Sequence, residues 1–135
     1  MPDFIEPMLA TLASAPFDDA DWLFEVKWDG FRVEAVVRHG EVRTWTRGRQ
    51  DAAKYFGSFL APPTWIDAGE AIVDGEVVAF GRDGEPDFAL LGSRSGGLAY
   101  VIFDLLWLDG ESLIARPLEE RWATADAVPA PACPP

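Results

Sequence analysis

The feature that most constrains this chain is a predicted β-hairpin centred on residues 25–32. Residues 22–28 alternate in the manner of a β-strand, because large apolar side chains recur at every second position. One face would carry Leu23, Glu25 and Lys27, and the other would carry Trp22, Phe24, Val26 and Trp28. Asp29-Gly30 is typical of a tight turn, so Phe31 is expected to begin the return strand.

Lys27 is the candidate nucleophile of this hairpin, because it lies at the end of the expected strand among large aromatic side chains. A lysine with the ordinary pKa of about 10.4 is neutral in only about one of a few thousand molecules at pH 7, a deficit of roughly 4–5 kcal/mol. Desolvation by apolar neighbours, or positive charge from Arg32 or a bound metal, would reduce that deficit. The alternative is a surface ion pair with Glu25 or Asp29, which would contribute little to stability.

Charge is distributed unevenly along the chain, whose formal net charge is −12. This balance argues against the chain alone binding a nucleic-acid backbone. Residues 27–54 are the exception, since they contain four acidic residues and seven basic ones: Lys27, Arg32, Arg38, Arg43, Arg47, Arg49 and Lys54. The basic segment begins at the candidate nucleophile and predicts a local anion site, with a solvated basic hairpin as the alternative.

Length and composition restrict the class of protein. The 135 residues, 49% of them hydrophobic, suffice for one domain with a buried core or for part of a larger one. No stretch approaches the roughly 20 apolar residues of a membrane span, so no membrane partner is expected. A single cysteine, Cys133, excludes disulfides within the chain and fits a cytoplasmic location. There is no Gly-Lys-Ser/Thr phosphate-binding loop, and His39 is expected in a turn.

The remaining elements are predicted from alternation, apolar runs and turn residues. The expected strands cover 32–38, 41–46, 71–80 and 98–108, and the last should be a central strand because it is the most hydrophobic run. The expected helices cover about 51–60, 87–91 and 117–126. Residues 93–97 are expected to form a flexible loop. Residues 1–127 would form a partial domain, and residues 128–135 a disordered proline-rich tail.

Two of the apolar strands carry acidic residues that a buried strand does not favour. Asp74-Gly75-Glu76 interrupts the strand at 71–80, and conflicts of this kind tend to mark functional positions. An ordinary bulge or turn is the alternative. Asp104 lies in the middle of the strand at 98–108 and needs a partner there, since an unpaired buried charge is costly.

In this order and spacing, four segments resemble the covalent nucleotidyltransferases: ATP-dependent DNA ligases, with RNA ligases and capping enzymes as relatives. Residues 27–32 match the first motif of the family, Lys-x-Asp-Gly-x-Arg. Thr46-Arg47-Gly48, Asp74-Gly75-Glu76 and residues 100–106 are similar to its next three elements, so the resemblance covers roughly residues 5–122. Residues 7–10 and 103–110 look most like bacterial ligases of the end-joining repair type.

The resemblance implies an α+β fold of mainly antiparallel sheets with short flanking helices. This would be the N-terminal part of an ATP-grasp-like nucleotidyltransferase domain, the adenylation domain of a DNA ligase. In such a domain, Lys27 would attack the α-phosphate of ATP, expel pyrophosphate and hold AMP through a phosphoramide bond. The AMP would then pass to a 5′-phosphate of nicked or broken DNA, where a 3′-hydroxyl displaces it.

The same resemblance implies ATP-binding roles for five residues besides the nucleophilic lysine. Arg32 and Arg47 would contact the nucleotide sugar, its phosphates or the nick phosphate, and Glu76 would hold the ribose or assist a metal. Phe103 would stack on adenine, a role that suits an aromatic face, and Glu25 would lie beside the adenine edge. Mg²⁺ would neutralise the triphosphate and help lower the pKa of the lysine. The sequence assigns no residues as ligands of that metal.

The family pattern continues with a metal-binding glutamate, two lysines that grip the α-phosphate and an OB-type domain that clasps DNA. None of these follows Trp122 in this chain. We therefore expect the adenylation domain to be incomplete, with the missing motifs supplied by other domains or by a second polypeptide of a split ligase. The alternative is a non-catalytic nucleotide-binding remnant. An RNA ligase or guanylyltransferase fits the matched segments less well.

Overall fold

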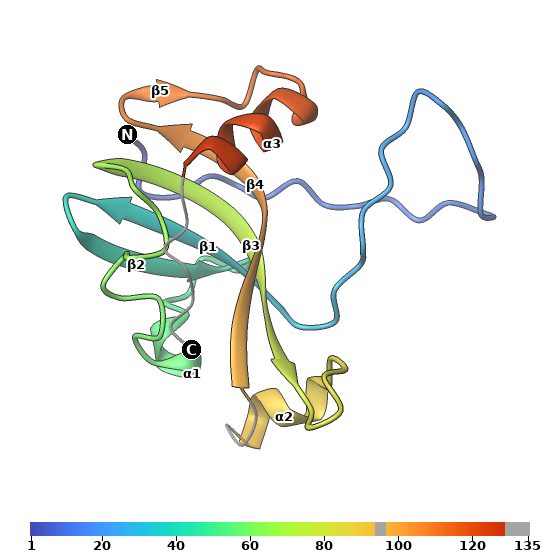
Figure 1. Ribbon diagram of the computed structural model, residues 1–135, viewed down its shortest axis with the longest axis horizontal. Helices are drawn as coiled ribbons and strands as arrows, with labels where there is room; N and C mark the ends of the chain where they lie inside the picture. The colour runs from blue at the N-terminus through green and yellow to red at the C-terminus, as the bar shows by residue number, and fades with distance from the viewer. Residues whose placement is uncertain (94–96, 129–135) are drawn as a thin grey trace.

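The computed structural model describes residues 1–93 and 97–128. These residues form a five-stranded antiparallel sheet with the strand order β2-β1-β3-β4-β5 (Figure 1). The strands are β1 (Phe31–Arg38), β2 (Glu41–Thr46), β3 (Glu70–Phe80), β4 (Gly97–Leu108) and β5 (Glu111–Ser112). The helices are α1 (Ala53–Phe56), α2 (Phe88–Ser93) and α3 (Leu118–Ala127). The predicted α+β class, with an antiparallel sheet and short helices, is confirmed.

The strands predicted at 32–38, 41–46 and 71–80 are confirmed as β1, β2 and β3. The turn between β1 and β2 places His39 and Gly40 at φ values of 49° and 85°, the left-handed region that a two-residue hairpin turn requires. The segment Asp74-Gly75-Glu76 does not break β3. All three of its residues pair with β1 on one side and with β4 on the other.

The prediction that residues 98–108 form the central strand is wrong. The centre of the sheet is β3, which lies between β1 and β4. Within the described residues, β4 has a second neighbour only at Trp107 and Leu108, which pair with the two residues of β5. The hydrophobicity of β4 has another cause, since helix α3 packs along it and contributes Ala125 to the same apolar cluster as Leu105 (Figure 1).

The sheet buries apolar side chains on both faces. On one face, apolar residues of β1, β3 and β4 pack with one another and with the segments around α1 and α2. The buried residues from these strands include Val33, Ala35, Val37, Val73, Val77 and Leu105. The apolar cluster on the opposite face is smaller. It contains Val36, Ile72 and Leu106, which pack against Met1 and Ile5. The N-terminal residues therefore serve as a cover for the second face.

We refer to residues 1–10 as the N-terminal strap. It runs along β1 and is held there by side chains of that strand. Arg38 Nη2 donates to the Met1 carbonyl at 3.1 Å, and the Ile5 N–H donates to Glu34 Oε1 at 3.1 Å. These bonds orient the strap so that its last residues reach the candidate site described below.

The strand predicted at residues 22–28 is not formed. Residues 22–29 have no regular secondary structure, and Trp22, Phe24 and Val26 are 60%, 61% and 69% exposed. Alternation alone does not make a strand, because its backbone groups need a neighbouring strand and none pairs with this segment among the described residues. Lys27 therefore lies in an irregular segment that leads into β1, and not at the end of a strand.

The helices are close to their predicted positions but differ in length. The helix expected at 51–60 is limited to α1, which Gly57 follows with a φ of 69°. Residues 87–91 and 117–126 are confirmed as helical in α2 and α3, apart from one residue at each start. Residues 94–96 of the expected loop and 129–135 of the expected tail lie outside the described residues. Across the described part, no helix has the length and apolar character needed to cross a membrane.

Candidate nucleotide-binding site

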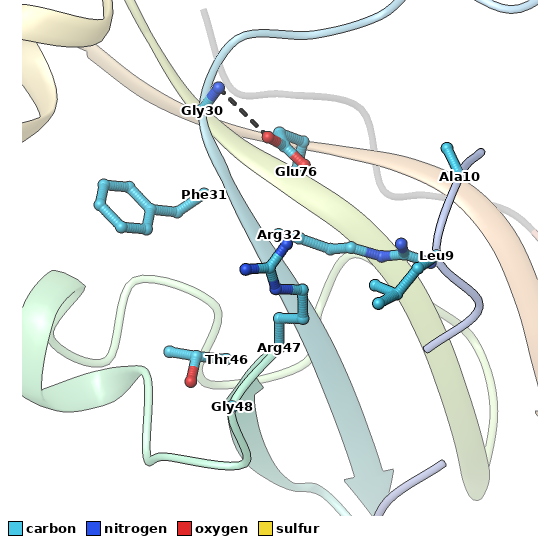
Figure 2. A pocket seen from close by; sticks show the side chains of 9 residues that line it. All are labelled: Leu9, Ala10, Gly30, Phe31, Arg32, Thr46, Arg47, Gly48 and Glu76. Atoms are coloured by element: carbon cyan, nitrogen blue, oxygen red, sulfur yellow. Dashed lines mark hydrogen bonds between the residues drawn. The ribbon is translucent and has the colours of Figure 1, made fainter. Parts of the chain in front are cut away.

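Two adjoining cavities lie where the segment before β1 crosses the sheet. The first, the lysine cavity, has a volume of about 360 Å³ and is lined by Ala10, Glu25, Val26, Lys27, Trp28, Arg32, Glu76 and Phe103. The second, the arginine cavity, has a volume of about 670 Å³ and is lined by Leu9, Ala10, Gly30, Phe31, Arg32, Thr46, Arg47, Gly48 and Glu76 (Figure 2). Because Ala10, Arg32 and Glu76 line both, the two cavities adjoin and form one candidate site.

Gly30, which directly precedes β1, brings the lysine-bearing segment down onto β3. Its backbone N–H donates a hydrogen bond to Glu76 Oε1 at 3.2 Å (Figure 2). A Cβ atom here would lie 2.2 Å from the carbonyl oxygen of Val77, so a larger residue does not fit without a shift of the backbone. The glycine of the first motif is thus explained by the lack of space for a Cβ atom. Glycine permits the close approach that places Lys27 in the same cavity as Glu76.

The guanidinium group of Arg32 is held from two sides. It forms a forked pair with Asp74, in which Nε lies 3.1 Å from Oδ1 and Nη2 lies 2.7 Å from Oδ2. Its Nη1 donates to the carbonyl of Met8 in the N-terminal strap at 2.8 Å, and its Cζ lies 5.6 Å from the centre of the Phe103 ring. The hydrogen bonds to Asp74 raise the pKa of Arg32 above its ordinary value. Charge-assisted bidentate bonds are directional, so they fix the orientation of this side chain, which lines both cavities.

Asp74 is the middle one of three acidic residues that lie opposite one another on neighbouring strands. It pairs in register with Glu34 on β1 and with Asp104 on β4. Asp104 has the partner that its place in an apolar strand predicted, because Arg121 Nε lies 2.7 Å from its Oδ1. Glu34 is only 4% exposed. Burial raises its pKa to about 7, the hydrogen bond from the strap opposes this rise, and the charge of Asp74 adds to it.

Two carboxyl groups share the lysine cavity with Lys27. Burial raises the pKa of Glu76, while a backbone hydrogen bond and the charge of Lys27 oppose the rise. The pKa of Glu25 is also raised, first by burial and then by the charge of Asp104. Lys27 itself is exposed, and in residues 1–93 and 97–128 no ion pair joins it to Glu25 or Asp29. The surface pair considered from the sequence is therefore not formed.

Arg47 enters the arginine cavity from the turn that follows β2. Thr46 fixes this turn, since its N–H donates to the Gln50 carbonyl at 2.8 Å and its Oγ1 accepts from the Gln50 N–H at 3.1 Å. The Arg49 N–H also donates to the Thr46 carbonyl at 2.8 Å. Figure 2 shows the Arg47 side chain pointing from the end of β2 toward Arg32. The small polar residue before the arginine thus organises the loop that presents it.

The structure brings together the six residues predicted to bind ATP. One of them, Arg47, lines the arginine cavity, and the others line the lysine cavity: Glu25, Lys27, Arg32, Glu76 and Phe103. Their roles remain predictions. Sequence reasoning missed Glu34, which belongs to no matched motif, and the cavity-lining position of Ala10, which lies in the matched segment 7–10 but was assigned no role. Among the described residues, no group of three His, Cys, Asp or Glu side chains is placed to hold a metal ion.

Comparison with known proteins decides the family. A family model described as ATP dependent DNA ligase domain matches residues 7–128. The chain belongs to this family. The chain is 33% identical over 130 residues to the multifunctional non-homologous end joining protein LigD of Mycolicibacterium smegmatis, a match that covers 94% of the chain and 17% of the relative. It is 29% identical over 125 residues to the SPbeta prophage-derived DNA ligase-like protein LigB of Bacillus subtilis, with coverage of 87% and 45%.

Two solved ligase structures share the fold of this chain. A mycobacterial DNA ligase D complexed with ATP and MES superposes with a TM-score of 0.67 at 28% identity, over 76% of this chain and 35% of that one. The ligase domain of LigD from M. tuberculosis gives a TM-score of 0.62 at 28% identity, over 77% and 37%. The chain spans about a sixth of the LigD relatives and about a third of these ligase structures.

Proposed function

We propose that the ligase domain binds ATP in the two cavities and forms a covalent adenylate on Lys27. The observation that carries this proposal is the lysine cavity itself. It gathers Glu25 and Lys27 from before β1, Arg32 from β1, Glu76 from β3 and Phe103 from β4. These residues are up to 78 positions apart in sequence, and a solvated basic hairpin would give no reason for their convergence.

The proposed reaction forms one bond and breaks one. The neutral amine of Lys27 attacks the α-phosphorus of ATP, the bond to the bridging oxygen of the β-phosphate breaks, and pyrophosphate leaves. The amine loses a proton as the phosphoramide forms. A lysine near its ordinary pKa is almost entirely charged at pH 7, so attack requires positive charge nearby or desolvation. Arg32 lines the same cavity with its guanidinium paired to Asp74, so the positive charge would come chiefly from a metal ion bound with the triphosphate.

The nucleotide would lie across both cavities. Phe103 offers an aromatic face for adenine, and Glu25 offers a carboxylate for the base edge. Glu76, shared by both cavities, would accept a hydrogen bond from the ribose or assist a metal. Arg32 and Arg47 would contact phosphates in the arginine cavity. Mg²⁺ bound to the triphosphate would neutralise its charge and polarise the α-phosphate.

We propose the later steps because the chain belongs to this family. AMP would pass to the 5′-phosphate of nicked or broken DNA, and the 3′-hydroxyl would displace it, in end-joining repair and recombination in the cytoplasm. The net charge of −12 leaves this chain poorly suited to grip DNA alone. Contact with DNA would therefore depend on other domains or on a second polypeptide.

The test is adenylation of the chain with α-labelled ATP and Mg²⁺. We expect acid-labile label on the wild-type protein and none on Lys27→Ala, while Lys54→Ala, a lysine outside both cavities, serves as the control. Calorimetric titration with ATP would accompany the assay. ATP binding without label would favour the non-catalytic nucleotide-binding module, and addition of the missing motifs in trans would then test a split enzyme. Label that persists in Lys27→Ala would refute the assignment of the nucleophile.

A further inference from the structure

Phe103 reaches the lysine cavity because β4 contains one residue too many at this point. Asp74 pairs with Asp104, but the next residue of β3, Gly75, pairs with Ile102. Phe103 is thus the unpaired residue of a β-bulge, a feature that turns side chains out of their regular alternation. The residue opposite the bulge is also consistent with it. A Cβ on Gly75 would lie 2.6 Å from the carbonyl oxygen of Val101, so the close approach of β3 and β4 requires glycine.

The bulge changes the face of the sheet on which Phe103 lies. Leu105 and Tyr100 both pack in the same buried cluster, although they are five positions apart and strict alternation would place them on opposite faces. The extra residue restores them to one face. By the same count, Phe103 would lie beside Leu105 in a regular strand. In the actual strand it lines the lysine cavity.

Helix α3 contacts the bulge with two consecutive side chains. The indole N–H of Trp122 donates to the carbonyl of Phe103 at 2.9 Å. Arg121 forms a forked pair with Asp104, with Nε to Oδ1 at 2.7 Å and Nη2 to Oδ2 at 2.9 Å. The guanidinium group of Arg121 forms a further hydrogen bond, because its Nη1 donates to the carbonyl of Arg116. Helix α3 therefore holds the extra residue at its own carbonyl and through the side chain of the residue that follows it.

We propose that Trp122 and Arg121 are positioning residues for base recognition: they hold the bulge that aims the Phe103 ring into the nucleotide site. This inference rests on the proposed function, since it assumes that Phe103 contacts the base. Without the Trp122 bond, the Phe103 carbonyl loses a partner that the described sheet does not replace, and the bulge can move within β4. The base then loses its aromatic face, while the phosphate contacts of Arg32 and Arg47 are untouched.

The chain supplies a matched control. Trp65 also donates its indole N–H to a backbone carbonyl, that of Leu60 at 2.7 Å, but it lines neither the lysine cavity nor the arginine cavity. Trp122→Phe and Trp65→Phe therefore each remove one indole-to-carbonyl hydrogen bond and keep an aromatic ring. A purely structural role for Trp122 predicts the same behaviour from both variants. A positioning role predicts a difference in nucleotide binding.

The experiment measures the dissociation constants of ATP and of inorganic tripolyphosphate for the full chain and for both variants, at a temperature where circular dichroism shows all three folded. A base stacked on an aromatic side chain contributes enough that we expect Trp122→Phe to weaken ATP roughly tenfold. Tripolyphosphate should bind the three proteins equally, and Trp65→Phe should bind ATP like the wild type. Arg121→Gln should repeat the selective loss, and Arg121→Lys should restore part of it.

The outcomes separate the inference from the function on which it rests. If Trp122→Phe binds ATP as Trp65→Phe does, the positioning role is overturned and the proposed function stands. If Trp122→Phe loses ATP and tripolyphosphate to the same degree, the defect is general and the positioning role is again overturned. If the unaltered chain binds tripolyphosphate as tightly as ATP, the base is not recognised, and both proposals fail.

Discussion

Raising the pH toward neutrality is expected to weaken the fold through Glu34. This carboxyl group is 4% exposed, and burial raises its pKa from 4.5 to about 7. A raised folded-state pKa means that the neutral carboxyl contributes stability that is fully present below about pH 4.5 and is lost as the pH rises to about 7. At about 1.4 kcal/mol per pKa unit, the whole loss corresponds to about 3 kcal/mol, most of it above pH 5.5.

The assay is urea unfolding of the wild type and of Glu34→Gln at several pH values between 5.5 and 8. Glutamine keeps an oxygen that can accept the Ile5 N–H, so the strap contact is preserved while the titration is removed. The groups near Glu34, chiefly Asp74 and Arg32, remain in both proteins and cancel in the comparison. We expect the unfolding free energy of the wild type to fall by about 2 kcal/mol relative to the variant across this range. Parallel pH profiles would refute the reasoning.

Three further changes test other contacts of the site. Gly30→Ala places a Cβ 2.2 Å from a carbonyl oxygen, so it should abolish adenylation of Lys27 in the labelling assay, and full activity would contradict the steric argument. Asp74→Asn removes the charge that pairs with Arg32 and orients its guanidinium. The loss of this orientation should weaken ATP binding roughly tenfold in calorimetry, and unchanged or tighter binding would be the contrary result. Tyr100→Phe removes a 2.6 Å hydrogen bond to a β1 carbonyl, so thermal unfolding should show a loss of about 1 kcal/mol, and no loss would show that water replaces the hydroxyl.

The sequence was a good guide where a residue's neighbours lie close in the chain. The β1–β2 hairpin follows from alternation and the His39-Gly40 turn, and β3 follows from an apolar run. The segment 22–28 shows the limit of that reasoning, because its alternation is as regular as that of a strand but it has no pairing partner among the described residues. Whether a pattern becomes a strand depends on a partner elsewhere, which local sequence does not contain.

The candidate site shows the same division. That Lys27, Arg32 and Glu76 gather in one cavity could be predicted, because the residue types and their spacing match family motifs, and their chemical roles stay predictions. The supports were not, since Glu34 in β1 and Trp122 in α3 carry no motif and act only through contacts made in the folded chain. The need of Asp104 for a partner could be predicted from burial, but the identity of Arg121 as that partner could not.

The bulge at Phe103 makes the site depend on how many residues β4 contains as well as on which ones. Removing Phe103 alone would give a regular ladder between β4 and β3 at this point, in which Leu105 and Tyr100 would be four positions apart and would still share the core face. An aromatic residue at position 103 of a strand of the present length but without the bulge would instead lie beside Leu105 on the core face, although the motif residues would be unchanged. The core of the sheet therefore needs either the bulge or one residue fewer, and only the bulge places an aromatic side chain in the lysine cavity.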